Sequence, residues 1–344
     1  MNSIFTLFRR TIFPVCVAGL SVSPLAAQQT ELPTYKPTRQ IAGTIRVCGS
    51  PQMGDLLRLY EEGFHQLQPS VHFVDDLQST LTAVSGVSSG HAEIGLLGRE
   101  IWPTEVQAFQ SAEGNPPLVI EVATGSYDVP KATFALMIFV PKENPIATLS
   151  MDQLEEVFAD TQSANHVATW GDLGLTSEWA SRPIHLYGFT VGNDKSQIFA
   201  HLVFKHGEYW KKSLHESSNA PNGTDAGQFI VSAVASDPNA IGISNIHYAT
   251  SAVKALAIST VSHLTPIEPS RENVASRTYP LTRAVYIVLN TDATHPLNNA
   301  AREFLRFVLS RQGQATVEKE GNYLPLTSTI AASQLRDLNY QTQK

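Results

Sequence analysis

Short apolar runs alternate along the chain with stretches in which apolar residues recur every three or four positions. The run at 44–48 has the character of a buried strand, and from Asp55 onward Leu56, Tyr60 and Phe64 recur at the spacing of one helix face. The same patterns predict further strands at 71–74, 93–97, 118–123, 184–189, 241–244 and 253–258, and helices around 81–87, 151–158, 194–203, 229–235 and 301–308. Strands separated by helices indicate βαβ units, an α/β fold and mostly parallel sheets.

Two longer apolar runs, at 132–140 and 284–290, stand out from this alternation. Their nearly continuous apolar character predicts strands that are buried on both faces. They bracket the middle of the chain, as expected if the backbone crosses from one lobe to another and returns. We therefore expect two lobes, each a mostly parallel sheet flanked by helices, joined by a two-strand hinge. Two unrelated strands are the alternative. Together with the segment that begins at Tyr279 and is described below, the runs predict lobe I at 41–131 plus 280–344 and lobe II at 132–279.

The first 27 residues have a pattern of their own. Arg9 and Arg10 precede a mostly apolar stretch at 11–20, and small residues follow up to Ala27. That order is typical of a secretory signal, and the apolar stretch is shorter than the roughly 20 residues that span a bilayer. The sequence predicts a signal peptide at 1–27, a flexible lead-in at 28–40 and a periplasmic or secreted protein. An uncleaved membrane anchor is the alternative.

Composition and charge limit the classes of function that are expected. The 344 residues are 42% hydrophobic and 16% charged, which is typical of a globular protein. The net charge is −7, and it becomes −9 without the two signal arginines, with no basic block for nucleic acid. Cys48 is alone once Cys16 is lost with the signal, and we expect a buried thiol. No metal-ligand spacing or dinucleotide fingerprint occurs, so no metal and no cofactor are expected.

The segment 86–90 matches the Gly-x-Ser-x-Gly motif of serine hydrolases, with Ser88 as the nucleophile. That motif requires a strand before the serine and a helix after it. Here a helical pattern precedes Ser88 and the strand at 93–97 follows. We interpret the segment as the end of a helix closed by a glycine. A secreted serine hydrolase that uses Ser88 remains an alternative, although no enzyme activity is expected.

The turns between strand ends and helix starts are the best candidates for a binding site. They lie at 49–53, 76–80 and 192–196. Ligands of open α/β sheets gather at the carboxyl ends of strands, and the free N–H groups at helix N-termini suit anions. Ordinary capping of these helices is the alternative explanation.

Several passages are similar to one known family. The segment Tyr279-Pro280-Leu281-Thr282-Arg283, followed by AVYIVLN, resembles the returning strand of the phosphate-binding proteins of bacterial ABC transporters. Further similar passages lie at 145–158, 170–174, 233–242, 310–314 and 321–326. The resemblance covers about 41–327 and implies the type II periplasmic binding fold. It also implies a phosphate-like anion as ligand and an ABC permease in the inner membrane as partner.

The ligand loops differ from the family pattern. Ser50 is retained but Pro51 follows it, Gly98 takes the place of a serine, and Phe189 stands where the family has an arginine. Losing that arginine removes a bidentate clamp, so Arg99 or Lys195 would have to supply the positive charge. The ligand residues that we predict are Ser50, Met53, Ser79, Thr80, Arg99, Asn193, Asp194, Lys195 and Ser196.

The sequence therefore predicts a monomeric solute-binding protein that captures a small oxyanion, with phosphate first, in a cleft between its lobes. The alternative within the same fold is a binding or sensor module for another small polar ligand.

Overall fold

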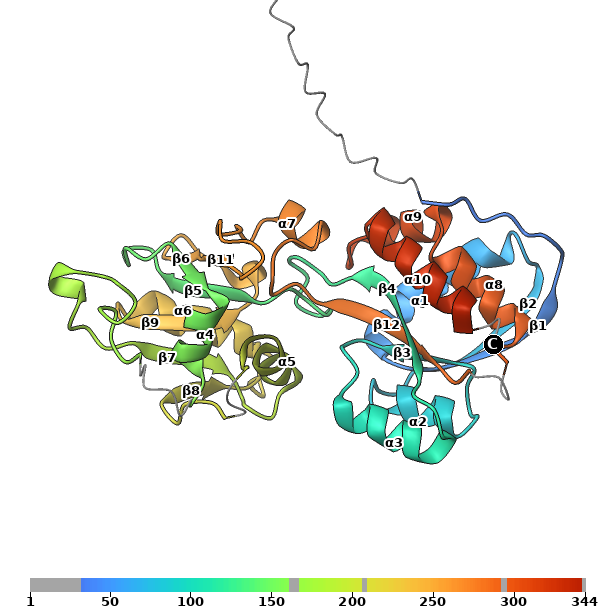
Figure 1. The fold of residues 1–344 in the computed structure, drawn as a ribbon, viewed down its shortest axis with the longest axis horizontal. Coiled ribbons are helices and arrows are strands. Elements are labelled where there is room, and N and C mark those ends of the chain that lie inside the picture. Colours follow the sequence, from blue (N-terminus) through green and yellow to red (C-terminus); the bar gives the residue numbers. More distant parts are fainter. Residues whose placement is uncertain (1–31, 161–166, 206–208, 292–295, 342–344) are drawn as a thin grey trace, which may run out of the picture.

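The protein is described here from a computed structural model, which covers residues 32–160, 167–205, 209–291 and 296–341. Two five-stranded sheets, each flanked by helices, form two lobes that lie side by side along the long axis of the molecule (Figure 1). This is the two-lobed α/β architecture that the sequence predicts.

Lobe I is built on a sheet in which β1 (Ala42–Gly49) is second from one edge. The strand that returns from lobe II, β12 (Ala284–Leu289), is second from the other edge. The strand order is β2 (Ser70–Asp76), β1, β3 (Ile94–Leu97), β12 and β4 (Leu118–Thr124). Successive residues such as Ile287 and Val288 belong to different hydrophobic clusters, because side chains alternate across a strand. One cluster includes side chains of α1 (Gly54–His65), α8 (Asn299–Val308), α9 (Arg311–Glu320) and α10 (Ser328–Gln341), and the other those of α2 (Thr82–Ser88) and α3 (Pro103–Glu113).

Lobe II has one large core around its own sheet. The strand order is β10 (Val253–Ala255), β5 (Met137–Pro141), β9 (Ala240–Ser244), β7 (His185–Phe189) and β8 (Leu214–Ser217). The helices are α4 (Met151–Phe158), α5 (Asp194–Val203), α6 (Ala226–Ser236) and α7 (Arg271–Ala275), and β6 (Thr148–Ser150) pairs with β11 (Ala257–Ser259). The 3₁₀ helices of the described chain are η1 (Pro51–Met53), η2 (Ser177–Trp179) and η3 (Ile246–Tyr248).

Two segments of the chain, 125–136 and 276–283, connect the lobes and are hydrogen-bonded to one another (Figure 1). The Leu136 amide donates to the Leu281 carbonyl over 3.0 Å, and the Gly125 amide donates to the Arg283 carbonyl over 2.8 Å. The outgoing and returning backbones therefore form a paired hinge. The boundaries proposed for the lobes, 131/132 and 279/280, fall within these crossing segments and stay a prediction.

The sheets are less parallel than the sequence indicated. In lobe I, β1 pairs in parallel with β2 and β3, whereas β12 runs antiparallel to β3 and β4. Lobe II repeats this arrangement, with parallel pairs around β7 and antiparallel pairs around β5. The strands that follow the two crossings are β5 in lobe II and β12 in lobe I. Each runs antiparallel to both of its neighbours in the sheet that it enters.

Two local differences from the sequence expectations have physical causes. The helix α3 has no counterpart among the predicted helices, because Phe109 is its only buried residue and its apolar pattern is weak. Its start was readable: Pro103 stands in the first turn and the Glu105 side chain accepts from the Trp102 amide over 2.9 Å. The apolar run at 132–140 is only partly strand, because β5 begins at Met137. The residues before it are apolar because they are buried in the crossing.

The predicted signal peptide at 1–27 lies outside the described residues, as does the start of the lead-in. From Leu32 onward the lead-in is held against lobe I: Tyr35 is buried, its hydroxyl donates to Glu303, and its amide donates to Gln312. Within the described ranges, the structure contains no helix with the length and apolar character needed to cross a membrane.

Candidate functional site

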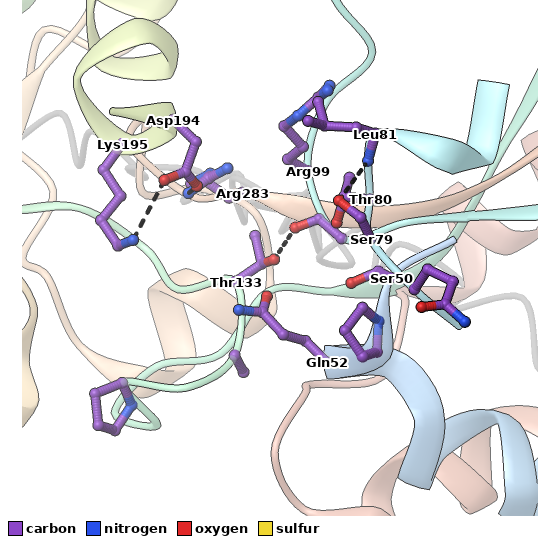
Figure 2. A pocket seen from close by; sticks show the side chains of 15 residues that line it. Ser50, Gln52, Ser79, Thr80, Leu81, Arg99, Thr133, Asp194, Lys195 and Arg283 are labelled. Carbon is purple, nitrogen blue, oxygen red and sulfur yellow. Dashed lines mark hydrogen bonds and ion pairs between the residues drawn. The ribbon is translucent and has the colours of Figure 1, made fainter. Parts of the chain in front are cut away.

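A cavity of about 380 Å³ lies where the lobes meet the hinge (Figure 2). Its walls come from the loop after β1, the loop after β2, the end of β3, the two crossing segments and the start of α5. The lining residues are Ser50, Pro51, Gln52, Gln78, Ser79, Thr80, Leu81, Gly98, Arg99, Pro130, Ala132, Thr133, Asp194, Lys195 and Arg283.

Ser50 is the first polar residue after β1 and is completely buried. Its amide donates to the Leu96 carbonyl over 3.0 Å, which fixes the backbone. Its Oγ has no hydrogen-bond partner within the described part of the protein, although it faces the cavity. A buried hydroxyl without a partner costs about 1–3 kcal/mol, so this oxygen is available to a ligand.

Gly98, at the end of β3, explains one departure from the family pattern. A Cβ at this position would lie 2.6 Å from Ser50 Oγ and 3.4 Å from Thr80 Oγ1. A side chain at 98 would therefore displace Ser50, and the glycine leaves room for that hydroxyl. The Gly98 carbonyl in turn accepts a hydrogen bond from the Thr133 hydroxyl, which ties the outgoing crossing segment to lobe I.

The loop after β2 brings Ser79 and Thr80 to the same wall, next to Ser50 (Figure 2). Ser79 Oγ accepts from the Leu81 amide over 3.2 Å. The Thr82 and Ala83 amides donate to the Ser79 and Thr80 carbonyls, which begins α2. Local hydrogen bonds thus hold the loop in a conformation that presents hydroxyls to the cavity.

Arg99 lines the cavity, but its guanidinium points away from Ser50 and Thr133 (Figure 2). Its terminal nitrogens donate to both carboxylate oxygens of Glu105 over 2.7 and 2.8 Å, and the group stacks over the Trp102 ring at 4.9 Å. The positive charge of Arg99 is therefore already paired within lobe I.

The opposite wall carries Asp194 and Lys195 from the start of α5, with Arg283 from the returning segment beside them (Figure 2). Lys195 Nζ lies 3.3 Å from Asp194 Oδ1, and Arg283 Nη1 lies 3.8 Å from Asp194 Oδ2. The Arg283 side chain is 1% exposed and also donates to Glu100 Oε2 through Nη2, over 3.0 Å.

Three of the predicted ligand residues lie outside the cavity lining. Met53 packs in the core of lobe I. Asn193 caps α5, with its side-chain oxygen accepting from the Lys195 amide over 2.9 Å. Ser196 is buried and donates to the Phe189 carbonyl over 2.8 Å. Contact of these residues with a ligand stays a prediction, while Ser50, Ser79, Thr80, Arg99, Asp194 and Lys195 are brought together.

Sequence reasoning missed Arg283 and Thr133. Arg283 was visible in the motif that precedes β12, as a charged residue directly before a buried strand. Its place in the site could not be recognised from the sequence, because Arg283 is far from Ser50 and Thr80 along the chain and meets them only when β12 joins the lobe I sheet. Thr133 lay hidden inside the apolar run at 132–140.

Ser88 and Cys48 lie away from the cavity. Ser88 is the last residue of α2 and β3 follows it, which is the helix-then-strand order that the sequence predicts, and Gly90 has a positive φ of 71° in the turn between them. The Ser88 hydroxyl donates to Glu113 over 2.7 Å. Cys48 is buried in β1, where burial raises the pKa of its thiol to about 11. Among the described residues, no cluster of three His, Cys, Asp or Glu side chains could hold a metal.

Comparisons with known proteins place the chain in a family. Residues 34–312 match the family model described as a PBP superfamily domain. The chain is 32% identical to the Phosphate-binding protein PstS of Pseudomonas aeruginosa, over 92% of this chain and 94% of that protein. It is 22% identical to Protein SphX of Synechococcus elongatus, over 94% of this chain and 90% of that protein.

Solved structures show the same fold. PstS from Borrelia burgdorferi superimposes with a TM-score of 0.56 at 17% identity, covering 82% of this chain and 98% of that one. An ABC-type phosphate transport receptor from Vibrio cholerae gives a TM-score of 0.53 at 18% identity, covering 81% of this chain and 99% of that one.

Proposed function

The chain belongs to the PBP superfamily and to the family of the phosphate-binding protein PstS, and from this premise we propose that it captures phosphate in the cavity between its lobes. The observation that carries the proposal is Ser50: a completely buried hydroxyl that faces the cavity and has no hydrogen-bond partner among the residues that the structure describes. The neighbouring hydroxyls of Ser79 and Thr80 and the cationic groups of the opposite wall suit an anion with several acceptor oxygens.

Capture would proceed by closure of the two lobes. Most lining residues belong to lobe I and the hinge, while lobe II contributes Asp194 and Lys195 at the start of α5. An oxyanion bound first to the hydroxyl wall would then attract the α5 wall, and the closed cleft would replace water with hydrogen bonds from both sides. The paired hinge segments are the place where such a rotation would occur.

We further propose that the protein is exported and delivers its ligand to an ABC permease. The basic, apolar and small-residue order of the first 27 residues supports export. The similarity to PstS and to an ABC-type phosphate transport receptor supports the transport role. The same evidence favours a binding protein over an enzyme.

Calorimetric titration of the purified protein with phosphate, sulfate and molybdate tests the proposed ligand. Phosphate should bind, and at 100 times its Kd it should stabilise the fold by about 2.7 kcal/mol. Small-angle scattering should show a smaller radius of gyration when phosphate is added.

A matched pair of variants locates the site. Thr80→Val keeps the side-chain shape and removes a cavity hydroxyl, so phosphate binding should weaken about tenfold. Ser85→Ala removes an exposed hydroxyl from the same helix region and should leave the Kd unchanged. Absence of heat and of any melting shift with millimolar phosphate would refute phosphate capture.

A further inference from the structure

The cations around the cavity differ in how firmly their charges are held. Arg99 is bound by Glu105 through two short hydrogen bonds, at 2.7 and 2.8 Å. Arg283 is held on one side by Glu100, through Nη2 at 3.0 Å and Nε at 3.3 Å. Its other terminal nitrogen, Nη1, is directed toward lobe II, where Asp194 Oδ2 lies 3.8 Å away. Arg283 therefore offers one edge of its guanidinium to the cavity while Glu100 holds the other edge.

Asp194 is shared between two cations: it accepts a long hydrogen bond from Lys195 and lies beyond hydrogen-bond distance of Arg283. Its two carboxylate oxygens lie 3.3 Å from Lys195 Nζ and 3.8 Å from Arg283 Nη1. Charge-assisted N–H···O bonds are normally about 2.7–2.9 Å long. The side chain is 42% exposed, so the carboxylate can move into water at little cost. These are the weakest charge contacts among the cavity residues.

The weak contacts of Asp194 matter for anion binding because the charges around the cavity cancel. Arg99, Arg283 and Lys195 are opposed by Glu105, Glu100 and Asp194, so the cavity has no net positive charge to offer. An incoming anion gains attraction only where a carboxylate gives up its cation, and Asp194 is the carboxylate that does so most easily.

We propose that Arg283 and Lys195 are the cations that bind the oxyanion, and that Asp194 is their resident counter-ion, which the anion replaces as the lobes close. This inference rests on the proposed function. Arg283 supplies, from the hinge, the guanidinium that is missing at Phe189. Because Glu100 belongs to lobe I and Asp194 to lobe II, exchange of Asp194 for the ligand would also loosen an interlobe contact and couple binding to closure.

The first test changes the counter-ion. Asp194→Asn keeps the size of the side chain and removes its charge, and it should tighten phosphate and sulfate binding by about threefold or more. Asp152→Asn is the matched control, since Asp152 also lies in the first turn of a helix and pairs with a lysine, Lys205, outside the cavity. It should leave both dissociation constants unchanged. Weaker phosphate binding by Asp194→Asn would overturn the counter-ion role, because it would make Asp194 a direct ligand.

The second test changes the cation. Arg283→Gln should weaken phosphate binding about tenfold or more, and Arg283→Lys, which keeps the charge but loses the fork, should fall between it and the wild type. Glu100→Gln removes the carboxylate that holds Arg283 and keeps the cation, so binding should be retained. The melting temperature without ligand is measured for each variant. If Arg283→Lys and Glu100→Gln lower the melting temperature equally and leave the Kd unchanged, Arg283 has only a structural role and the inference is wrong.

Titration of the wild type distinguishes failure of the counter-ion role from failure of phosphate capture. Phosphate binding by the wild type with the opposite effect at Asp194 would refute the inference alone. A wild type that binds no phosphate would refute the proposed function. In that case, anion binding by the Asp194→Asn variant would still support the counter-ion role. If this variant binds neither phosphate nor sulfate, the counter-ion role is refuted as well.

Discussion

The two walls of the cavity are built in different ways. The lobe I wall is rigid: a backbone hydrogen bond fixes Ser50, close packing surrounds Gly98, and the Thr133 hydroxyl of the crossing segment donates to the Gly98 carbonyl. The lobe II wall consists of Asp194 and Lys195, partly exposed side chains in a loose ion pair. The difference suggests a division of roles, in which the preformed wall recognises the ligand and the adaptable wall closes on it. Preorganised groups give up little freedom on binding.

The largest difference in stability is expected between two glycines that lie next to the two walls, Gly49 before Ser50 and Gly192 before α5. Gly49 has a φ of 119°, and a Cβ there would collide with the Leu96 carbonyl oxygen and lie 2.8 Å from its amide nitrogen. Gly49→Ala should destabilise the protein by about 3 kcal/mol in urea unfolding, because the end of β1 must shift. Gly192, in the loop before α5, has nothing within 4 Å of its Cβ position. Gly192→Ala should stay within about 0.5 kcal/mol of the wild type, and equal losses would show that the walls do not differ in rigidity.

The next contrast concerns the hydroxyl on the rigid wall. Ser50→Ala removes a buried Oγ that no described residue hydrogen-bonds, so the free energy of unfolding should stay the same or rise by up to about 1 kcal/mol. Phosphate binding should nevertheless weaken about tenfold, as expected for a lost hydrogen bond to a charged group. Chemical unfolding and calorimetry on the same preparation measure both effects. A loss of stability without a change in Kd would mean that Ser50 is a packing residue.

Ser196, behind the lobe II wall, should behave in the opposite way. Its hydroxyl is buried and donates to the Phe189 carbonyl over 2.8 Å. Ser196→Ala should lower stability by about 1 kcal/mol and leave the phosphate Kd close to that of the wild type. A larger effect on the Kd than on stability would make Ser196 the ligand residue that the sequence predicted.

The smallest effect is expected at a carboxylate pair that supports lobe I outside the cavity. Glu61 of α1 contacts Asp75 of β2. Burial is the main cause, and repulsion from Asp75 the second, of a rise in the pKa of the Glu61 carboxyl to about 8. A raised pKa means that the folded state keeps a proton that the unfolded chain releases above about pH 4.5. This contribution to stability is therefore complete below pH 4.5 and is lost as the pH rises to about 8.

Glu61→Gln should remove that dependence. At pH 8 the variant should be more stable than the wild type by about 1 kcal/mol, a value discounted for the partial exposure of the pair. At pH 4.5 the two proteins should differ less. Unfolding curves from pH 4.5 to 8.5 measure the slope, and parallel slopes for the two proteins would contradict the shared proton. The phosphate Kd should not change, because neither residue lines the cavity.

The sequence by itself determined many of the strands and helices and several of the residues that line the cavity. The apolar periodicities located β1, α1, β7 and α5, and the turns that follow the strands contained Ser50, Thr80 and Lys195. These features are local, because strand ends and helix starts are written in neighbouring residues. The two long apolar runs, together with the resemblance to the phosphate-binding proteins, also predicted the two-lobed architecture.

The tertiary structure alone decided which charges are available. The sequence indicated Arg99 as a source of positive charge, but Glu105, six positions later in a helix that the sequence did not reveal, binds it. Arg283 reaches the cavity from a strand that returns across the hinge, and its partners Glu100 and Asp194 come from different lobes. An ion pair depends on distances between segments far apart in the chain, and those distances exist only after the sheets and the hinge have formed.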